Sequence, residues 1–186
     1  MDDIKGHSIL AVPDGGFYVT SNGEKPNAPA TVWFVKDAKK TLVDTGLKFA
    51  TGMAYRPDQW LLSVVDGHSK WIYSYQMGTN GILTNKERFF PLHVQDWEDD
   101  AGAESVCYSL EGRQFVATKS GVQISADDGP TQVILPVPDG ARVTGVCLGG
   151  RDRDTLFALC GNQIWQRKIQ QHGMGVFSPW TKVSAN

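Results

Sequence analysis

The chain of 186 residues is short of cysteine, of clustered positive charge and of long apolar runs. Its three cysteines are too few and too widely spaced for a disulfide-rich domain or a zinc cluster. The formal net charge is −2 and no Lys/Arg run exceeds two residues, which argues against nucleic-acid binding and against a polybasic membrane patch. No apolar segment is long enough for a signal peptide or a membrane span. We therefore expect one domain that binds neither nucleic acid nor membrane.

The cysteines also indicate a compartment. Cys107, Cys147 and Cys160 each lie in an apolar run, and their number is odd. This pattern is typical of free, buried thiols in a reducing environment. We expect three buried thiols and a cytoplasmic location.

Helical periodicity is also missing, whereas short strand-like segments occur almost everywhere. Segments such as "GFYVTS", "ATVWFVK" and "RQFVATK" are β-branched or aromatic and are bounded by Gly, Pro, Asn or Asp. That pattern predicts an all-β protein with many turns and little or no helix.

The strands form a repeat. Strand, turn and second strand recur with turn residues Asp14, Asp58, Glu111 and Asp152, at intervals of roughly 40–50 residues, which is the period of a β-propeller blade. The chain therefore predicts an all-β propeller of about four antiparallel blades in a single domain, over residues 7–46, 49–92, 103–138 and 142–183. The last blade has three clear strands, and residues 175–183 are either its fourth strand or a tail.

Aromatic residues of the second blade are expected to be core, because a blade buries both faces against its neighbours. The alternating large side chains are Trp60, Leu62 and Val64 on one strand, and Trp71, Tyr73 and Tyr75 on the next. An open ring would expose apolar faces and strand edges. The chain therefore closes as a small ring, belongs to something longer, or pairs with a second copy, and we expect a homo-oligomer, most simply a dimer.

Three segments make the pattern more specific. Residues 51–90 read "TGMAYRPDQWLLSVVDGHSKWIYSYQMGTNGILTNKERFF", and the "GILTNKERFF" at their end follows a turn. "GAESVCYSLEGRQFVATKSGVQI" and "ILPVPDGARVTGVCLGGRDRDTLFALCGNQIWQRKI" follow. From about Ser8 to Ile169 the chain resembles the gluconolactonase/regucalcin family, with its N-terminal blades apparently missing.

The resemblance implies a six-bladed fold, lactone hydrolysis and one divalent cation (calcium, magnesium, manganese or zinc) at a channel mouth. The family's metal-binding asparagine aligns with Thr51, its aspartate with Glu104, and a substrate-binding asparagine with His7. These residues are the expected metal ligands, with Glu104 also the expected general base. The alternatives are a strand-start loop carboxylate for Glu104 and an N-terminal surface residue for His7.

Two further features have open interpretations. Asp66 and His68 follow a central strand and are either an acid/base pair or a polar turn. The acidic segment 96–104 is a second cation site, a substrate lid or a solvated loop.

The sequence thus supports two functions. The first is a metal-dependent hydrolase of sugar or related lactones with an altered site. The alternative is a non-catalytic propeller that binds a ligand or acts as a scaffold. In either case we expect a small lactone or sugar-like ligand.

Overall fold

The fold of the chain is described by a computed structural model that covers residues 4–13, 15–22, 28–58, 60–126 and 129–175. Within these ranges, fifteen strands form four antiparallel sheets, each with its strands in sequence order. Two short 3₁₀ turns are the only helical elements in these ranges, η1 (Thr79–Gly81) and η2 (Pro138–Gly140). The sheets are arranged as a four-bladed β-propeller, as the sequence predicted.

Three blades have four strands each and the fourth has three. Blade 1 contains β1 (Gly6–Ala11), β2 (Phe17–Ser21), β3 (Ala30–Lys36) and β4 (Lys39–Leu47). Blade 2 contains β5 (Ala50–Tyr55), β6 (Leu61–Asp66), β7 (Trp71–Met77) and β8 (Leu83–Pro91). Blade 3 contains β9 (Ser105–Tyr108), β10 (Gln114–Thr118), β11 (Gly121–Ser125) and β12 (Thr131–Leu135). Blade 4 contains β13 (Gly145–Gly149), β14 (Thr155–Cys160) and β15 (Gln163–Lys168), and most of the segment 175–183 lies outside the described residues.

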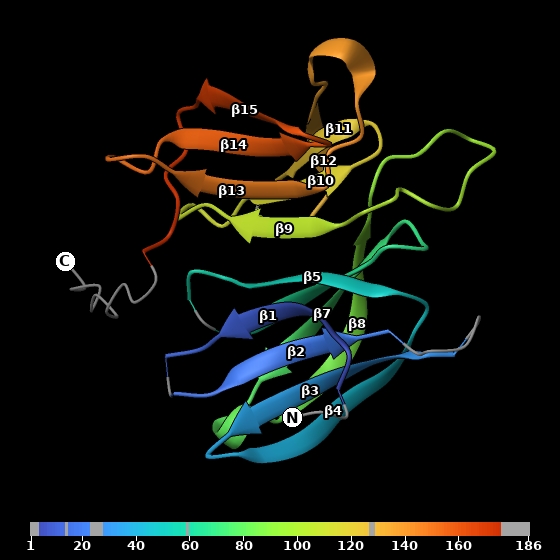
Figure 1. Ribbon diagram of the computed structural model, residues 1–186, viewed down its shortest axis with the longest axis vertical. Coiled ribbons are helices and arrows are strands. Elements are labelled where there is room, and N and C mark those ends of the chain that lie inside the picture. Colours follow the sequence, from blue (N-terminus) through green and yellow to red (C-terminus); the bar gives the residue numbers. More distant parts are fainter. Residues whose placement is uncertain (1–3, 14, 23–27, 59, 127–128, 176–186) are drawn as a thin grey trace.

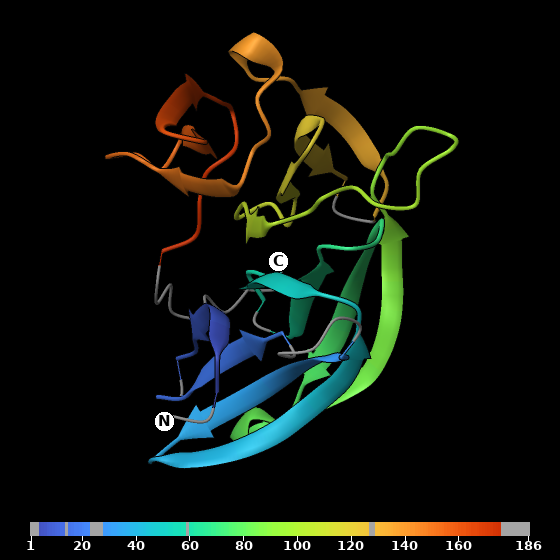
Figure 2. The same ribbon diagram turned by 45° about the vertical axis from the view of Figure 1, so that its right-hand side comes forward.

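The first strand of each blade lies at the centre of the molecule. β1 contacts β5, β5 contacts β9, and β9 contacts β13. These inner strands run in the same direction in Figure 1, so that their first residues lie at one end of the central channel. The sheets follow one another in an arc that begins with blade 1 and ends with blade 4 (Figures 1 and 2).

Apolar side chains fill the space between successive blades because the middle strands are buried on both faces. On β6, Leu62 and Val64 join the cluster between blades 1 and 2, whereas Val65 joins the cluster between blades 2 and 3. On β10, Val116 faces blade 2 and Phe115 faces blade 4. Side chains on a strand point alternately to opposite faces, so one apolar run supplies two interfaces.

Among the described residues no further blade packs against the outer faces of blades 1 and 4, and both faces keep exposed apolar side chains. On blade 1, Ile9 is 69% exposed and Leu42 is 48% exposed. They lie at the two ends of one cross-strand row. On blade 4, Leu159 pairs with Ile164, and these residues are 42% and 70% exposed. We refer to these two surfaces as the open faces.

Two expectations about individual side chains are wrong. Trp60 is 60% exposed because it precedes β6, in the turn after β5. The other side chains expected in the core are buried (Leu62, Val64 and Tyr75) or half-buried (Trp71 and Tyr73). Cys147 is exposed, although Cys160 is buried and Cys107 half-buried. Val146 belongs to the cluster between blades 3 and 4, so its neighbour Cys147 points to the opposite side of β13, where it borders the central channel cavity.

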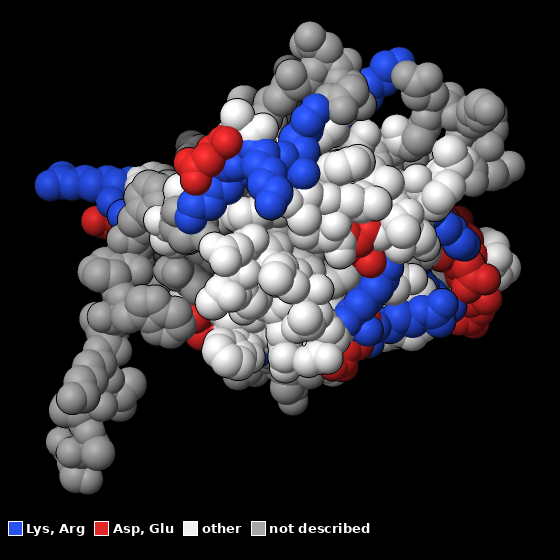
Figure 3. All heavy atoms as spheres, turned by 90° about the horizontal axis from the view of Figure 1, so that it is seen from below, with Lys and Arg blue, Asp and Glu red and all other residues white. Residues whose placement is uncertain are grey.

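The surface seen from below, on the side where β4 lies in Figure 1, carries groups in which basic and acidic side chains lie side by side. A wide neutral area lies between them (Figure 3). Within the part of the chain that the structure describes, no helix is long and apolar enough to cross a membrane.

Candidate functional site

The candidate site lies where the inner strands begin. His7 and Thr51 are the second residues of β1 and β5, and Glu104 directly precedes β9. Because the inner strands are adjacent and run in the same direction, all three lie near one end of the channel, which we call the mouth. The fold therefore brings together strand starts that are far apart in the sequence.

Glu104 is paired with an arginine side chain of the same chain. Its carboxylate forms an ion pair with Arg142, from the segment that leads into β13. The Arg142 guanidinium also donates to the carbonyl of Gly102 at 3.4 Å. Glu104 is half-buried, and its backbone N–H donates to the carbonyl of Ala117. The carboxylate thus bridges blades 3 and 4 through a guanidinium.

Thr51 is fully buried and its hydroxyl connects two blades. The hydroxyl oxygen lies 2.9 Å from the carbonyl oxygen of Ala103 and 3.2 Å from that of Val65. A hydroxyl has one proton, so it is shared between these two acceptors. The side chain is 0% exposed and does not reach the surface of the mouth.

Asp66 is buried at the end of β6 and caps a turn. Its carboxylate accepts the backbone N–H groups of Lys48 at 3.1 Å, Phe49 at 3.0 Å and His68 at 3.2 Å. Both oxygens are engaged, so the carboxylate stabilises the connection between blades 1 and 2. Its geometry is that of the satisfied polar turn considered from the sequence.

The two candidate histidines meet on one phenylalanine. The ring of His68 is stacked on Phe49 with 4.4 Å between centroids, and His7 approaches Phe49 edge-on at 5.7 Å. Both histidines are exposed and Phe49 is half-buried. A Cβ added at Gly67 would lie 3.0 Å from the Ala103 carbonyl oxygen, so this aromatic group borders the segment that carries Glu104. We call His7, Phe49 and His68 the aromatic platform.

The acidic segment is held by lysines and by backbone groups. Glu98 pairs with Lys119 at 2.8 Å, and Asp99 pairs with Lys70 at 2.7 Å, which lowers the pKa of Asp99. Asp100 accepts the N–H of Gly102 at 2.6 Å. Among the residues that the structure describes, no three His, Cys, Asp or Glu side chains are grouped so that they could hold a metal ion.

The channel itself is apolar. A cavity of about 310 Å³ is lined by residues 9–11 of β1, 53–55 of β5, 106–108 of β9, Cys147 and Leu148 of β13, and residues 174–175. Burial raises the pKa of the Cys107 thiol to about 12. The ion pair of Glu104 with Arg142 and the aromatic platform lie toward the strand starts, at the mouth.

Sequence reasoning missed Arg142 and Phe49. Arg142 lies three residues before the fourth inner strand, and Phe49 directly precedes the second. Both positions correspond to the strand starts that pointed to His7 and Glu104. A search of every strand start for polar and aromatic residues would have included them.

Comparisons with known proteins agree with the fold. The model of the SMP-30/gluconolactonase/LRE-like region matches residues 9–160. A gluconolactonase of Zymomonas mobilis is 22% identical over 141 residues, which are 74% of this chain and 39% of that protein.

Solved structures show the same architecture. A luciferin-regenerating enzyme superposes with a TM-score of 0.77 and 16% identity, over 90% of this chain and 62% of the enzyme. The calcium-binding protein regucalcin of Agrobacterium tumefaciens superposes with a TM-score of 0.76 and 15% identity, over 91% of this chain and 62% of that chain. The chain thus spans less than two thirds of these relatives' lengths. The match to the family model over most of the sequence shows that the chain belongs to the SMP-30/gluconolactonase/LRE-like family.

Proposed function

We propose that this chain is a ligand-binding propeller of the gluconolactonase family, which holds a small lactone or sugar-like molecule at the mouth and does not by itself perform metal-dependent hydrolysis. The ion pair between Glu104 and Arg142 carries this proposal. A cation at Glu104 would have to displace a guanidinium, and Arg142 would repel a divalent ion that bound nearby.

The other expected metal donors do not fit a shared site either. The Thr51 hydroxyl is buried between two carbonyl groups, and the His7 ring packs edge-on against Phe49. Hard divalent cations need several oxygen ligands that converge on one point. The residues present therefore do not fit the three-ligand site that the family resemblance implied.

The same mouth is suited to a polar ring. Phe49 and His68 offer a partly exposed stacked surface on which the apolar face of a sugar or lactone ring can pack. The guanidinium of Arg142 can donate to a lactone carbonyl, and the carboxylate of Glu104 can accept from hydroxyl groups. These contacts bind and orient a ligand without a chemical step.

A metal-dependent lactonase is the second candidate. It is favoured by the place of Glu104 at the mouth, and by relatives that are described as gluconolactonases and as a calcium-binding protein. In this case Asp66, whose oxygens both accept backbone N–H groups, orients the turn. The exposed His68 is then the group that moves protons.

Calorimetry with calcium, manganese and zinc separates the two candidates. We expect no saturable binding by the wild-type chain and no hydrolysis of glucono-δ-lactone above the buffer rate. Gluconate should nevertheless give saturation-transfer NMR signals that weaken in His68→Ala and Arg142→Gln. Stoichiometric metal binding that is lost in Glu104→Gln, together with lactone turnover, would instead establish the lactonase. Absence of gluconate signals would reject binding at the mouth.

A further inference from the structure

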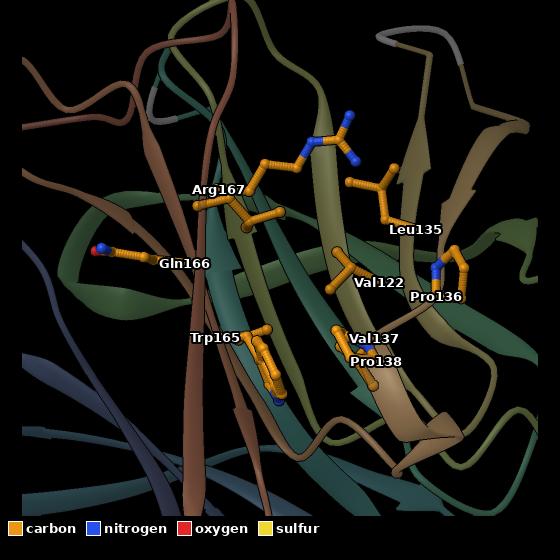
Figure 4. Close-up of a pocket in the computed structure, with 10 residues that line it drawn as sticks. Val122, Leu135, Pro136, Val137, Pro138, Trp165, Gln166 and Arg167 are labelled. Atoms are coloured by element: carbon orange, nitrogen blue, oxygen red, sulfur yellow. The ribbon is translucent and has the colours of Figure 1, made fainter.

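A second cavity lies between blades 3 and 4, away from the mouth. Its volume is about 310 Å³, within the range of small-molecule sites. One wall comes from blade 3, where Val122 and Leu135 are cross-strand partners, and continues through Val137 and Pro138. Figure 4 shows these side chains facing those of blade 4. We call this cavity the slot.

The opposite wall is formed by blade 4. Trp165 is paired with Ala158, and Arg167 with Leu156, on adjacent strands. Trp165 and Arg167 are two residues apart on β15, so both point into the slot, whereas Gln166 between them points away (Figure 4). The slot is therefore a narrow apolar space with a polar group near each end.

At one end is an unsatisfied donor. The indole Nε1 of Trp165 is buried and has no hydrogen-bond partner among the residues that the structure describes. A buried N–H without a partner costs about 1–3 kcal/mol relative to a satisfied one. A ligand whose acceptor atom reaches this N–H from the slot would recover this free energy.

At the other end is a positive charge. In Figure 4 the Arg167 side chain extends across the slot toward Leu135. The residue is exposed, and none of the ion pairs between described residues includes it. A guanidinium beside apolar surface is suited to a carboxylate whose apolar body lies against that surface.

We propose that the slot binds a small aromatic carboxylate that also carries a hydrogen-bond acceptor. The ring lies between Trp165 and the Val137–Pro138 wall, the carboxylate pairs with Arg167, and the acceptor receives the indole N–H of Trp165. This site is separate from the mouth and does not depend on the function proposed there.

4-Hydroxyphenylacetate is the probe, because it has a ring, a carboxylate and a phenolic oxygen at opposite ends. The full chain is labelled with ¹⁵N and the indole N–H resonances of its six tryptophans are recorded during the titration. Trp165→Phe assigns the Trp165 resonance. We expect that resonance to shift saturably while the indoles outside the slot remain in place. Phenylacetate, which lacks the acceptor, should bind with a smaller shift of the Trp165 resonance.

Arg167→Gln tests the charge without touching the core, because Arg167 is exposed. We expect its affinity for the probe to fall about tenfold, the usual effect of losing a charged hydrogen bond. The matched control is Arg151→Gln, at an exposed arginine that does not line the slot. No shift of the Trp165 resonance at millimolar probe, equal shifts with phenylacetate, or equal loss in both arginine variants would overturn the proposal.

Discussion

Replacing Asp66 with asparagine separates a structural role for this carboxylate from a catalytic one. In the structure, one oxygen accepts the N–H groups of Phe49 and His68, and the other accepts that of Lys48. The asparagine carbonyl can keep the first two contacts. Its NH₂ group would then face the Lys48 N–H, so one donor meets another donor.

The expected change in the free energy of unfolding follows from the hydrogen bond that is lost. A hydrogen bond to a charged group contributes about 1.5–3 kcal/mol. Asparagine is uncharged, so the substitution also removes the cost of burying a carboxylate that has no ion-pair partner among the described residues. This gain offsets part of the loss. We therefore expect Asp66→Asn to lower the free energy of unfolding by about 2 kcal/mol, since one charged contact is lost and two weaken. Asp66→Ala should cost more because all three N–H groups lose their acceptor.

Urea unfolding followed by tryptophan fluorescence measures this difference, provided that the slope of the transition is unchanged. Asp58→Asn is the matched control. Asp58 accepts the N–H of Trp60 at 3.0 Å and forms a partly exposed ion pair with Arg56 at 3.3 Å, so a change within about 0.5 kcal/mol is expected there. If Asp66→Asn is as stable as Asp58→Asn, the capping interpretation of Asp66 is wrong.

Three further outcomes are expected. Thr51→Val should lower the free energy of unfolding by about 1–2 kcal/mol in the same urea assay, because two buried carbonyls lose their donor, while Thr51→Ser retains most of the stability. At pH 8 a thiol reagent should label Cys147 rapidly and Cys107 slowly in the native protein. Cys147 is exposed, whereas burial raises the pKa of the Cys107 thiol to about 12 and keeps it protonated. Equal labelling rates would contradict this difference in exposure. We also propose that the open faces pair in a homodimer, so light scattering should show a dimer. Leu159→Glu, on the open face of blade 4, should dissociate it. The control Leu110→Glu, at an exposed leucine in a turn of blade 3, should not. A wild-type monomer would reject that proposal.

The fold was largely predictable because its signals are local. Alternation of apolar and polar residues, with turn residues between the strands, predicted an all-β chain, and the spacing of the turns predicted four blades. The prediction that Trp60 lies in the core was wrong for a local reason, since β6 begins at Leu61, one residue later than the apolar pattern indicated. The exposure of Cys147 had a different cause, because its side chain borders the central channel cavity, which forms only when the blades assemble.

The sequence and the structure contribute different information about the candidate site. The sequence pointed to His7, Thr51 and Glu104, and the structure places all three at or near strand starts at one end of the channel. What each side chain does there depends on its partners. Thr51 is satisfied by Ala103, 52 residues later, and Glu104 by Arg142, 38 residues later.

The sequence by itself determined the strand pattern, the blade repeat and the family resemblance, since these follow from neighbouring residues and turn chemistry. Only the tertiary structure decided which polar groups are free to meet a ligand. The packing of blade against blade buries Thr51 and Asp66 among backbone groups and brings Arg142 to Glu104. It also leaves the indole N–H of Trp165 without an acceptor within the described part of the chain. These contacts join residues that are distant along the chain, and no local pattern encodes them.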